Sequence, residues 1–304
     1  MLKLAGAVKQ ALYSAGYYAR RLRRERFPGV AVLCYHGVRD DSRPPGTMVF
    51  EGLHVLASEL EAQCHLLRET CHPISLDDWR AARRGGPPLP PRPVLMTFDD
   101  GYRTVFTVAR PILRRYSIPA VVFVCSEPVE RQQLFWHDAV AQVQGEGQVA
   151  QAKAVRFDEW QALRTRCRRE AGLESPHAPL TIAEVKELAD DRSMEVGAHT
   201  CAHPILARAP KEDQREQIRE NKVRLERWTG RPVTAFAYPN GQPGQDYTAD
   251  TVELVGESGF EFGFTARHGF ARPEEPDLER SRFFMLAGIS AAELAHRLCE
   301  SWRG

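Results

Sequence analysis

Residues 94–102 read Val-Leu-Met-Thr-Phe-Asp-Asp-Gly-Tyr, and this stretch decides both the fold class and the chemistry of the chain. The apolar run Val94–Phe98 ends at two adjacent carboxylates, Asp99 and Asp100, and Gly101 then allows a sharp backbone turn. Strands of a parallel sheet buried on both faces are typically short, near-continuous apolar runs. We therefore expect a buried strand whose carboxyl end carries two acidic side chains.

Further runs of the same kind occur along the chain, and segments with helical spacing of apolar residues separate most of them. This alternation indicates a parallel sheet covered by helices. Seven strand–helix units predict an α/β barrel related to the TIM barrel, although an open doubly wound sheet would produce the same order of strands and helices. The expected strands are Val30–Tyr35, Val94–Phe98, Ala120–Val124, Met194–Ala198, Thr234–Tyr238, Phe260–Thr265 and Arg282–Leu286.

Polar motifs that follow the expected strands favour the barrel. Cys34–Gly37 ends the first strand, Asp99 and Asp100 end the second, His199 follows the fourth, and Tyr238–Gly241 follows the fifth. The βα loops at the carboxyl ends of barrel strands build active sites. Because every motif lies at this end, we expect all of them to meet in one site.

One carboxylate of the pair and the two imidazoles of His199 and His203 make a set of three metal ligands. Three protein ligands leave one position open for water, as catalytic zinc sites require. The second carboxylate is then free to take a proton from that water. Pro204 disfavours an α conformation at His203, so we expect the histidines on a loop rather than inside a helix.

Composition excludes several classes of function. The chain has 304 residues, of which 43% are hydrophobic, so it can bury a large core. A net charge of +1 gives no field that would favour nucleic acid, and no apolar run is long enough to span a membrane. The seven cysteines show no CxxC spacing, and the N-terminus reads poorly as a secretory signal. We expect reduced thiols and a cytoplasmic protein.

We expect the barrel domain to occupy residues 29–304. Two segments do not follow the alternation of strands and helices, one before this domain and one inserted within it. Residues 1–28 predict a basic amphipathic helix, which either lies peripherally on the inner membrane or docks against the barrel. An insertion at about 127–180 separates the third and fourth strands. It could form a lid or substrate wall, or a helical decoration with a solvated basic face.

Thr-Phe-Asp-Asp-Gly-Tyr at 97–102 and His-Thr-Cys-Ala-His at 199–203 resemble the polysaccharide deacetylase family, also called NodB-like or carbohydrate esterase family 4. The resemblance runs from about Val30 to Leu286. It is strongest to the branch with poly-N-acetylglucosamine deacetylases, which share the Tyr-His strand end at 35–36 and the Tyr-Pro-x-Gly motif at 238–241. It implies a distorted (β/α)7 barrel and a hydrolase that removes an N-acyl group, most simply acetyl, from an amino sugar of a polysaccharide or glycolipid.

The resemblance also implies roles for individual residues. Asp99 becomes the general base, while Asp100, His199 and His203 bind a divalent metal, for which zinc is the default and cobalt, nickel or iron are acceptable. The backbone N–H of Asn240 becomes the oxyanion donor. Thr200 would steady the histidine loop by hydrogen bonding.

The chain departs from the family pattern in two places. Ala237 replaces the arginine that orients the base, so Arg280 or Arg282 would have to supply the charge. The Leu-x-His motif is absent from the last strand, which leaves His36 and His268 as candidates for the catalytic acid or as structural hydrogen-bond partners. His296 belongs to a Leu-x-His sequence, but we expect it on the surface of the terminal helix. We expect five further histidines to take no part in the site and His54 to be solvated; the five are His54, His65, His72, His137 and His177.

The substrate implied by the resemblance is an N-acylated glycan. Two alternatives stay open: a deformylase or deacetylase of a lipid-linked saccharide at the inner membrane, and a non-catalytic glycan-binding member of the fold. The basic N-terminal helix favours the lipid-linked substrate, and the altered motifs leave the non-catalytic alternative open.

Overall fold

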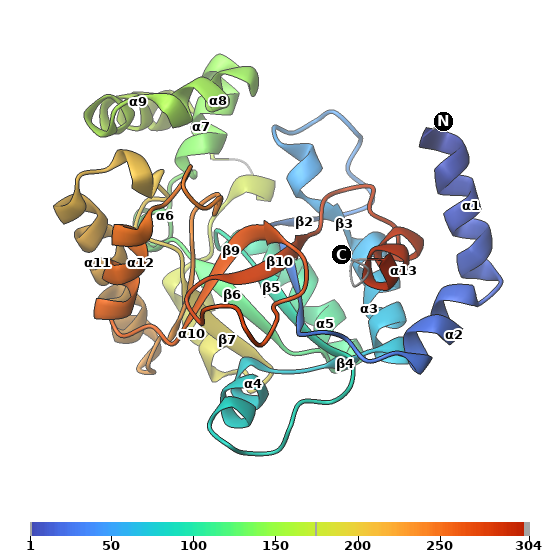
Figure 1. The fold of residues 1–304 in the computed structure, drawn as a ribbon. Coiled ribbons are helices and arrows are strands. Elements are labelled where there is room, and N and C mark those ends of the chain that lie inside the picture. The colour runs from blue at the N-terminus through green and yellow to red at the C-terminus, as the bar shows by residue number, and fades with distance from the viewer. Residues whose placement is uncertain (1, 174, 301–304) are drawn as a thin grey trace.

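Seven parallel strands close into a barrel in the computed structural model, which describes residues 2–173 and 175–300 (Figure 1). The first strand of the barrel pairs with both the second and the last, so the sheet has no open edge there and the doubly wound alternative is wrong. In barrel order the strands are β1 (Ala31–Tyr35), β5 (Pro93–Phe98), β6 (Ala120–Val124), β7 (Met194–Ala198), β8 (Ala235–Ala237), β9 (Phe262–His268) and β10 (Arg280–Phe284).

The strands differ from their predicted bounds mainly at the end of the barrel sequence. β9 ends at His268 rather than Thr265, and β10 begins at Arg280, two residues before its predicted start at Arg282. Three two-residue strands were not predicted, because such short ladders leave no periodicity in the sequence. They are β4 (His72–Pro73), which pairs with the start of β5, and β2 (Val38–Arg39) with β3 (Val55–Leu56), which form a separate pair.

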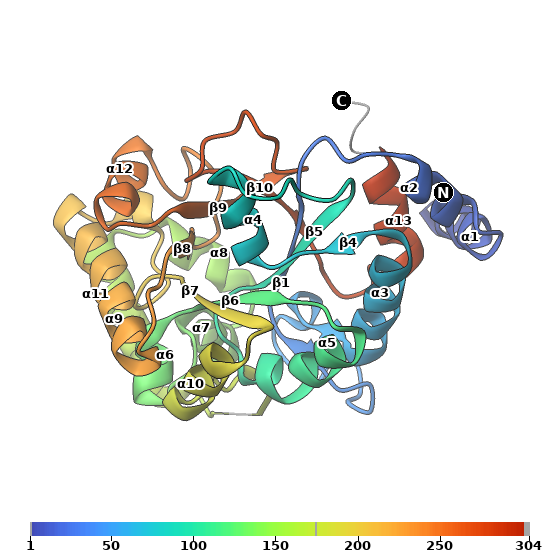
Figure 2. The same ribbon diagram turned by 90° about the horizontal axis from the view of Figure 1, so that it is seen from below.

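Helices surround the barrel (Figure 2). Alternate strand residues point to the two faces, and both faces are buried, which explains the near-continuous apolar runs. Leu33, Met96 and Val122 belong to the core under the helices, whereas Leu95 and Phe123 belong to the core inside the barrel. The surrounding helices are α3 (Ala57–Thr70), α5 (Arg110–Tyr116), α10 (Ile182–Asp190), α11 (Lys211–Thr229), α12 (Ala249–Glu257) and α13 (Ala291–Glu300).

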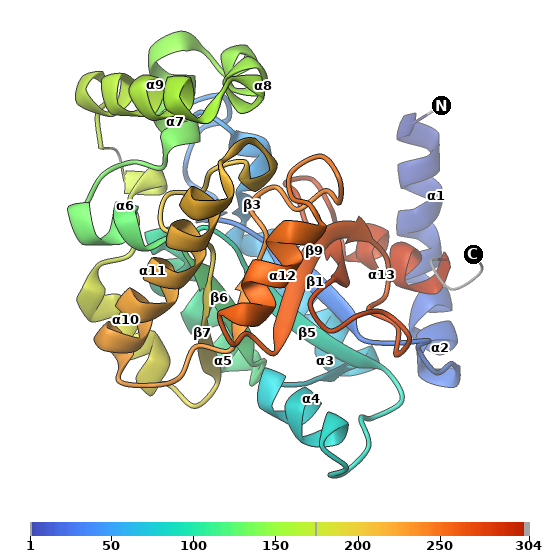
Figure 3. The same cartoon turned by 60° about the vertical axis from the view of Figure 1, so that its left-hand side comes forward.

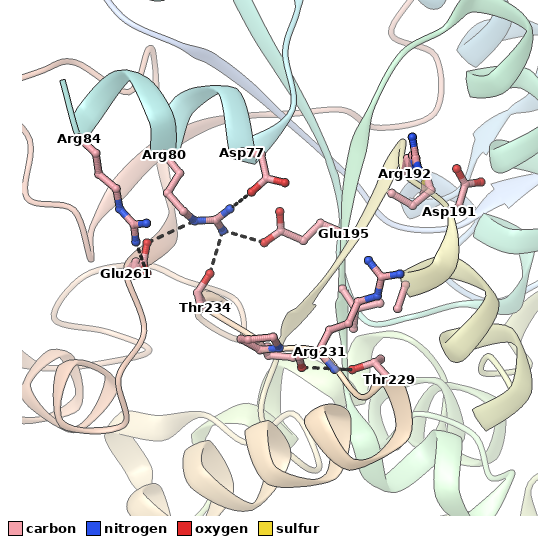
Figure 4. Close-up of a pocket in the computed structure, with 15 residues that line it drawn as sticks. Asp77, Arg80, Arg84, Asp191, Arg192, Glu195, Thr229, Arg231, Thr234 and Glu261 are labelled. Atoms are coloured by element: carbon pink, nitrogen blue, oxygen red, sulfur yellow. Dashed lines mark hydrogen bonds and ion pairs between the residues drawn. The ribbon is translucent and has the colours of Figure 1, made fainter. Parts of the chain in front are cut away.

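Helix α4 (Leu76–Arg83) closes the amino end of the barrel, where Trp79 packs on Phe262 inside the barrel at a ring-centroid distance of 5.2 Å. A cavity of about 700 Å³ lies beside it (Figure 4). Arg80 projects into this cavity and donates to Glu195 at 2.9 Å and to Thr234 at 2.8 Å. It also pairs with Asp77 and Glu261, so its charge is already matched by protein carboxylates. We interpret this network as structural, because it fixes α4 across the amino end of the barrel.

The N-terminal segment forms two helices rather than one, α1 (Leu2–Ser14) and α2 (Tyr17–Arg24), because Gly16 adopts a φ of 71° between them. Both lie beside α13 (Figure 3). Lys9 pairs with Glu293 at 2.6 Å, and the Tyr18 hydroxyl lies 3.1 Å from the ring Nδ1 of His296. Over the described ranges, no helix combines the length and apolar character needed to cross a membrane.

The insertion forms α6 (Ser126–Arg131), α7 (Trp136–Gln144), α8 (Gly147–Ala154) and α9 (Phe157–Glu170). Helices α7 to α9 stand above one end of the barrel and share a small apolar core of their own (Figure 1). The arginine-rich run is only partly a solvated face, because Arg164 and Arg168 of α9 both bind the buried carboxylate of Glu127. These ion pairs join α9 to α6 within the insertion. The backbone N–H of Glu127 donates to the carbonyl of Cys201 in the histidine loop at 2.8 Å, and this bond anchors the insertion to the barrel.

Candidate active site

A cavity of about 160 Å³ opens at the carboxyl ends of the barrel strands. The sequence predicts seven residues for the site, and all of them except His268 line this cavity. Strand ends from β1, β5, β7, β8 and β10 contribute to it, as do the loop before β3 and the insertion. The lining residues are His36, Phe50, Leu53, Asp99, Asp100, His137, Val149, Lys153, His199, His203, Asn240 and Phe284.

Asp100, His199 and His203 form a compact, buried group within the cavity. Oδ1 of Asp100 lies 3.4 Å from Nε2 of His199 and 3.3 Å from Nε2 of His203. One ligand atom from each residue lies within 4.8 Å of the others. Nδ1 of His199 donates to the carbonyl oxygen of Ala237 at 2.7 Å, an arrangement that orients a metal-binding imidazole and leaves Nε2 for the metal.

The chemistry of this group fits a divalent metal. Oδ1 of Asp100 is buried and has no hydrogen-bond partner among the described residues, which is costly unless a cation compensates it. Burial raises the pKa of Asp100, but the close contacts with His199 and the neighbouring histidines outweigh burial and hold the pKa well below its usual value. Burial lowers the pKa of His203 to about 3, whereas for His199 the contacts with Asp100 and Asp99 outweigh burial and raise the pKa. An ionised carboxylate and a neutral imidazole are the forms that bind metals.

Left-handed backbone conformations concentrate around this group. Asp100, Thr200, His203 and Asn240 have φ angles of 72°, 63°, 60° and 57°, and such non-glycine positions store about 1–3 kcal/mol each. The histidine loop is held by specific bonds. The Thr200 hydroxyl accepts from the backbone N–H of His203 at 3.0 Å, and Trp136 of α7 donates to the His203 carbonyl at 2.7 Å. The expected loop conformation and the expected bond from Thr200 are both present.

Asp99 is held by Arg282, one of the two arginines that the sequence left open. Both terminal nitrogens of Arg282 donate to Asp99, one to each carboxylate oxygen at 2.8 Å. Arg280 instead binds Asp277 and the Arg272 carbonyl, away from the cavity. Burial raises the pKa of Asp99, but Arg282 outweighs burial and lowers it. Asp99 is therefore an ionised, oriented carboxylate that can accept a proton.

The two candidates for the acid lie in different places. His36 lines the cavity, and its Nδ1 is buried without a hydrogen-bond partner in the described ranges. His268 is exposed at the end of β9, where its ring packs on Phe283 at a centroid distance of 5.0 Å. Phe283 belongs to the core outside the barrel. The β9–β10 ladder shifts register before His268, and its ring lies on the outer side of the strand and not in the cavity, which corrects the prediction.

The insertion adds two residues that sequence reasoning missed. His137 of α7 lines the cavity, and its Nε2 lies 3.0 Å from the Tyr102 hydroxyl, which donates to Asp138 at 2.8 Å. Lys153 of α8 also lines it and donates to the side-chain oxygen of Asn240 at 2.5 Å. Neither residue lies in a recognisable motif, so only the three-dimensional arrangement shows them.

His54 corrects another expectation. It is fully buried, with its ring against Tyr102 at a centroid distance of 4.8 Å, and burial lowers its pKa to about 3. A Cβ at position 37 would lie 2.0 Å from Nδ1 of His54, so this packing requires Gly37. The ring is a packed neighbour of the site rather than a solvated side chain.

Comparison with known proteins agrees with this geometry. Residues 86–263, more than half of the chain, match the family model for polysaccharide deacetylases. The chain is 38% identical over 94 residues to the poly-beta-1,6-N-acetyl-D-glucosamine N-deacetylase of Escherichia coli strain K12. That match covers 31% of this chain and only 13% of the relative's length.

Two solved structures share the fold. The deacetylase PplD of Streptococcus pyogenes, solved in complex with acetate, aligns with a TM-score of 0.66 and 20% identity over 89% of this chain and 98% of that one. IcaB from Ammonifex degensii aligns with a TM-score of 0.63 and 22% identity over 90% of this chain and 98% of that one. The barrel, the strand-end motifs and the matched family model lead to one conclusion: the chain belongs to the polysaccharide deacetylase family.

Proposed function

We propose that this protein is a metal-dependent hydrolase that removes the N-acetyl group from an amino sugar of a poly-N-acetylglucosamine type of glycan. The observation that carries the proposal is the convergence of two differently held carboxylates in one cavity. Asp100 lies against two imidazoles, and Asp99 lies against Arg282. A glycan-binding protein without catalysis has no need for an oriented base beside a metal-ligand group, which argues against that alternative.

Asp100, His199 and His203 would hold the metal, for which zinc is the default. When bound, a divalent ion supplies an activated water and polarises the acetamide carbonyl. The rest of the reaction depends on residues of the chain. Asp99 takes a proton from the attacking water, and its bidentate bond to Arg282 keeps both oxygens in place.

Attack of water on the carbonyl carbon gives a tetrahedral oxyanion. The backbone N–H of Asn240 forms no other hydrogen bond within the described residues, so it is free to donate to that oxygen. The carbon–nitrogen bond then breaks, and the leaving amine needs a proton. His36 lines the same cavity and is the residue best placed to give it. The products are acetate and the free amino sugar.

A second candidate within the same chemistry is deacylation of a lipid-linked saccharide at the cytoplasmic face of the inner membrane. It is favoured by α1 and α2, where Val8 of α1 is 52% exposed and Tyr17, in the same helix as the arginines of α2, is 44% exposed. Exposed apolar side chains beside basic ones suit an anionic lipid surface.

Acetate release from β-1,6-linked N-acetylglucosamine oligomers tests the proposal directly. The metal-loaded protein should release acetate, and chelation followed by zinc or cobalt should abolish and restore it. Faster release from a lipid-linked saccharide than from the free oligomer would favour the second candidate. Binding of oligomers without any acetate release would support the non-catalytic alternative instead.

A further inference from the structure

Lys153 is a cationic side chain that the insertion places in the cavity. It lies in the last turn of α8 and lines the cavity together with the metal-ligand group. Its ammonium donates to the Asn240 side-chain oxygen at 2.5 Å. No carboxylate within the described ranges lies close enough to form an ion pair with it. An ammonium has three donors, so two of them have no described partner.

This lysine is fixed rather than a mobile surface side chain. Val149 and Ala152 of α8 are buried in the apolar core of the insertion, and Glu146 accepts from the backbone N–H of Phe50 at 2.7 Å. Burial lowers the pKa of Lys153, while Asp246 and Asp100 act in the opposite direction. A largely buried ammonium whose contact partner is a neutral amide is unfavourable unless an anion joins it.

The contact with Asn240 links Lys153 to the oxyanion side of the cavity. Asn240 has a left-handed backbone, with φ of 57°, and its side-chain Nδ2 is buried with no partner in the described part of the chain. The Lys153 bond holds the side chain of this strained residue in one orientation. The backbone N–H proposed to face the oxyanion belongs to the same residue.

Within the described residues, no carboxylate forms an ion pair with the ammonium in the ground state, and Asp246 favours its charge only from beyond ion-pair distance. Arg282 already neutralises Asp99, and a divalent ion would more than neutralise Asp100. The acetamide of the substrate is neutral. A negative charge appears on the carbonyl oxygen only when water has added to it. A fixed cation that gains its counterion at that point stabilises the transition state more than the bound substrate.

We propose that Lys153 positions Asn240 and supplies positive charge to the oxyanion that forms during deacylation, so that the insertion is a working part of the active site. This inference rests on the proposed deacetylase function. It assigns to α8 an electrostatic role that neither catalytic motif contains.

Three substitutions of Lys153 separate the effect of its positive charge from that of its hydrogen bond to Asn240. Lys153→Met removes both, Lys153→Gln keeps a donor for Asn240 but removes the charge, and Lys153→Arg keeps the charge. For both Lys153→Met and Lys153→Gln, kcat on N-acetylglucosamine oligomers should fall about 10- to 100-fold. This is less than the 10² to 10³ that a direct oxyanion donor contributes. KM, metal content and Tm should stay near wild type, and Lys153→Arg should recover most of the loss.

Lys186→Met is the matched control, since Lys186 is an exposed lysine of α10 far from the cavity lining, and it should behave as wild type. A second readout does not depend on turnover. Calorimetric titration of the metal-loaded proteins with acetate and with methylphosphonate should show weaker anion binding in Lys153→Met and Lys153→Gln, but not in Lys153→Arg.

Unchanged kcat and unchanged anion affinity in both neutral variants would overturn the role of Lys153 while leaving the deacetylase function standing. A rise in KM alone would also overturn it, because it would make Lys153 a ground-state contact. If wild type itself released no acetate from any N-acetylated glycan, the proposed function would fail. The anion titrations would then decide alone whether Lys153 supplies charge to the cavity.

Discussion

Arg282 and Asp99 come from β10 and β5, which flank β1 in the barrel, and they meet in a two-pronged hydrogen bond of 2.8 Å on each side. The guanidinium is 1% exposed, and its Nε donates to the Thr265 carbonyl at 2.9 Å. Rigid fork geometry of this kind fixes the plane of a carboxylate as well as its charge. The carboxylate that we propose as the base is therefore oriented from the far side of the first strand, not from the loop that carries the family's usual arginine.

Removing Arg282 should shift the acidic limb of the pH profile. Burial raises the pKa of Asp99, and Arg282 is the first of the charges that lower it, ahead of His199 and His36. The pKa of Asp99 should therefore rise in Arg282→Gln. Because the base works when ionised, the low-pH limb of kcat/KM should move to higher pH. Arg282→Lys keeps the charge and should move it less. If Arg282→Gln left the pH profile unchanged, the ion pair between Arg282 and Asp99 would have no role in catalysis.

The same substitution should destabilise the fold, because it leaves a buried carboxylate without its partner. Breaking a buried ion pair costs about 3–5 kcal/mol. Denaturant unfolding of Arg282→Gln should show a loss of this size, and the double variant with Asp99→Asn should recover part of it. Equal stability of the single and double variants would contradict the coupling.

His36 and His268 should differ sharply when replaced by alanine. His36→Ala should retain metal, lower kcat more than it raises KM, and lose the high-pH limb of the rate profile, which reports deprotonation of the acid. His268→Ala should resemble wild type, because His268 is exposed on the outer side of β9. Loss of the high-pH limb in His268→Ala, with His36→Ala unaffected, would reverse this assignment.

Thr200→Val should weaken metal binding without removing a metal ligand. Valine has the shape of threonine but cannot accept the hydrogen bond that the His203 backbone N–H now makes with the Thr200 hydroxyl. Loss of a supporting bond around a metal site typically lowers affinity about 10- to 100-fold. Competition with a fluorescent zinc chelator measures this, and an unchanged affinity would contradict a supporting role for Thr200.

The N-terminal helices allow docking and membrane contact to be tested separately. Leu22 of α2 is fully buried against the barrel core, so Leu22→Ala should lower stability by about 2–5 kcal/mol. If α1 contacts lipid, Val8→Asp should reduce binding to anionic vesicles and leave stability unchanged, since Val8 is exposed. Vesicle binding that ignores Val8→Asp and added salt would remove the membrane proposal.

Local patterns in the sequence predicted the strands and the two metal-ligand histidines, while the choice of Asp100 over Asp99 came from the family resemblance. Apolar runs locate buried strands, and the strand-end motifs bring Asp100, His199 and His203 together once the sheet is parallel. The partner of Asp99 could not be chosen, since the choice between Arg280 and Arg282 depends on strand register. The β10–β9 ladder shifts register between Arg280 and Arg282, and Arg282 is the one that reaches Asp99.

Residues supplied by the insertion could not be predicted for a different reason. His137 and Lys153 reach the cavity through packing between helices, and no spacing along the chain encodes that contact. The solvated position expected for His54 was wrong because helix α3 begins only at Ala57. His54 instead lies in the preceding turn and is enclosed by Gly37 and Tyr102.

The central claim is that two neighbouring carboxylates have different tasks, and parallel measurement of metal content and acetate release tests it most directly. Asp99→Asn should keep about one divalent ion per chain and lose at least about 10²-fold in kcat, the smallest contribution typical of a general base. Asp100→Asn should lose both the metal and the activity, as should His199→Ala. Metal loss in Asp99→Asn with metal retained in Asp100→Asn would contradict the account.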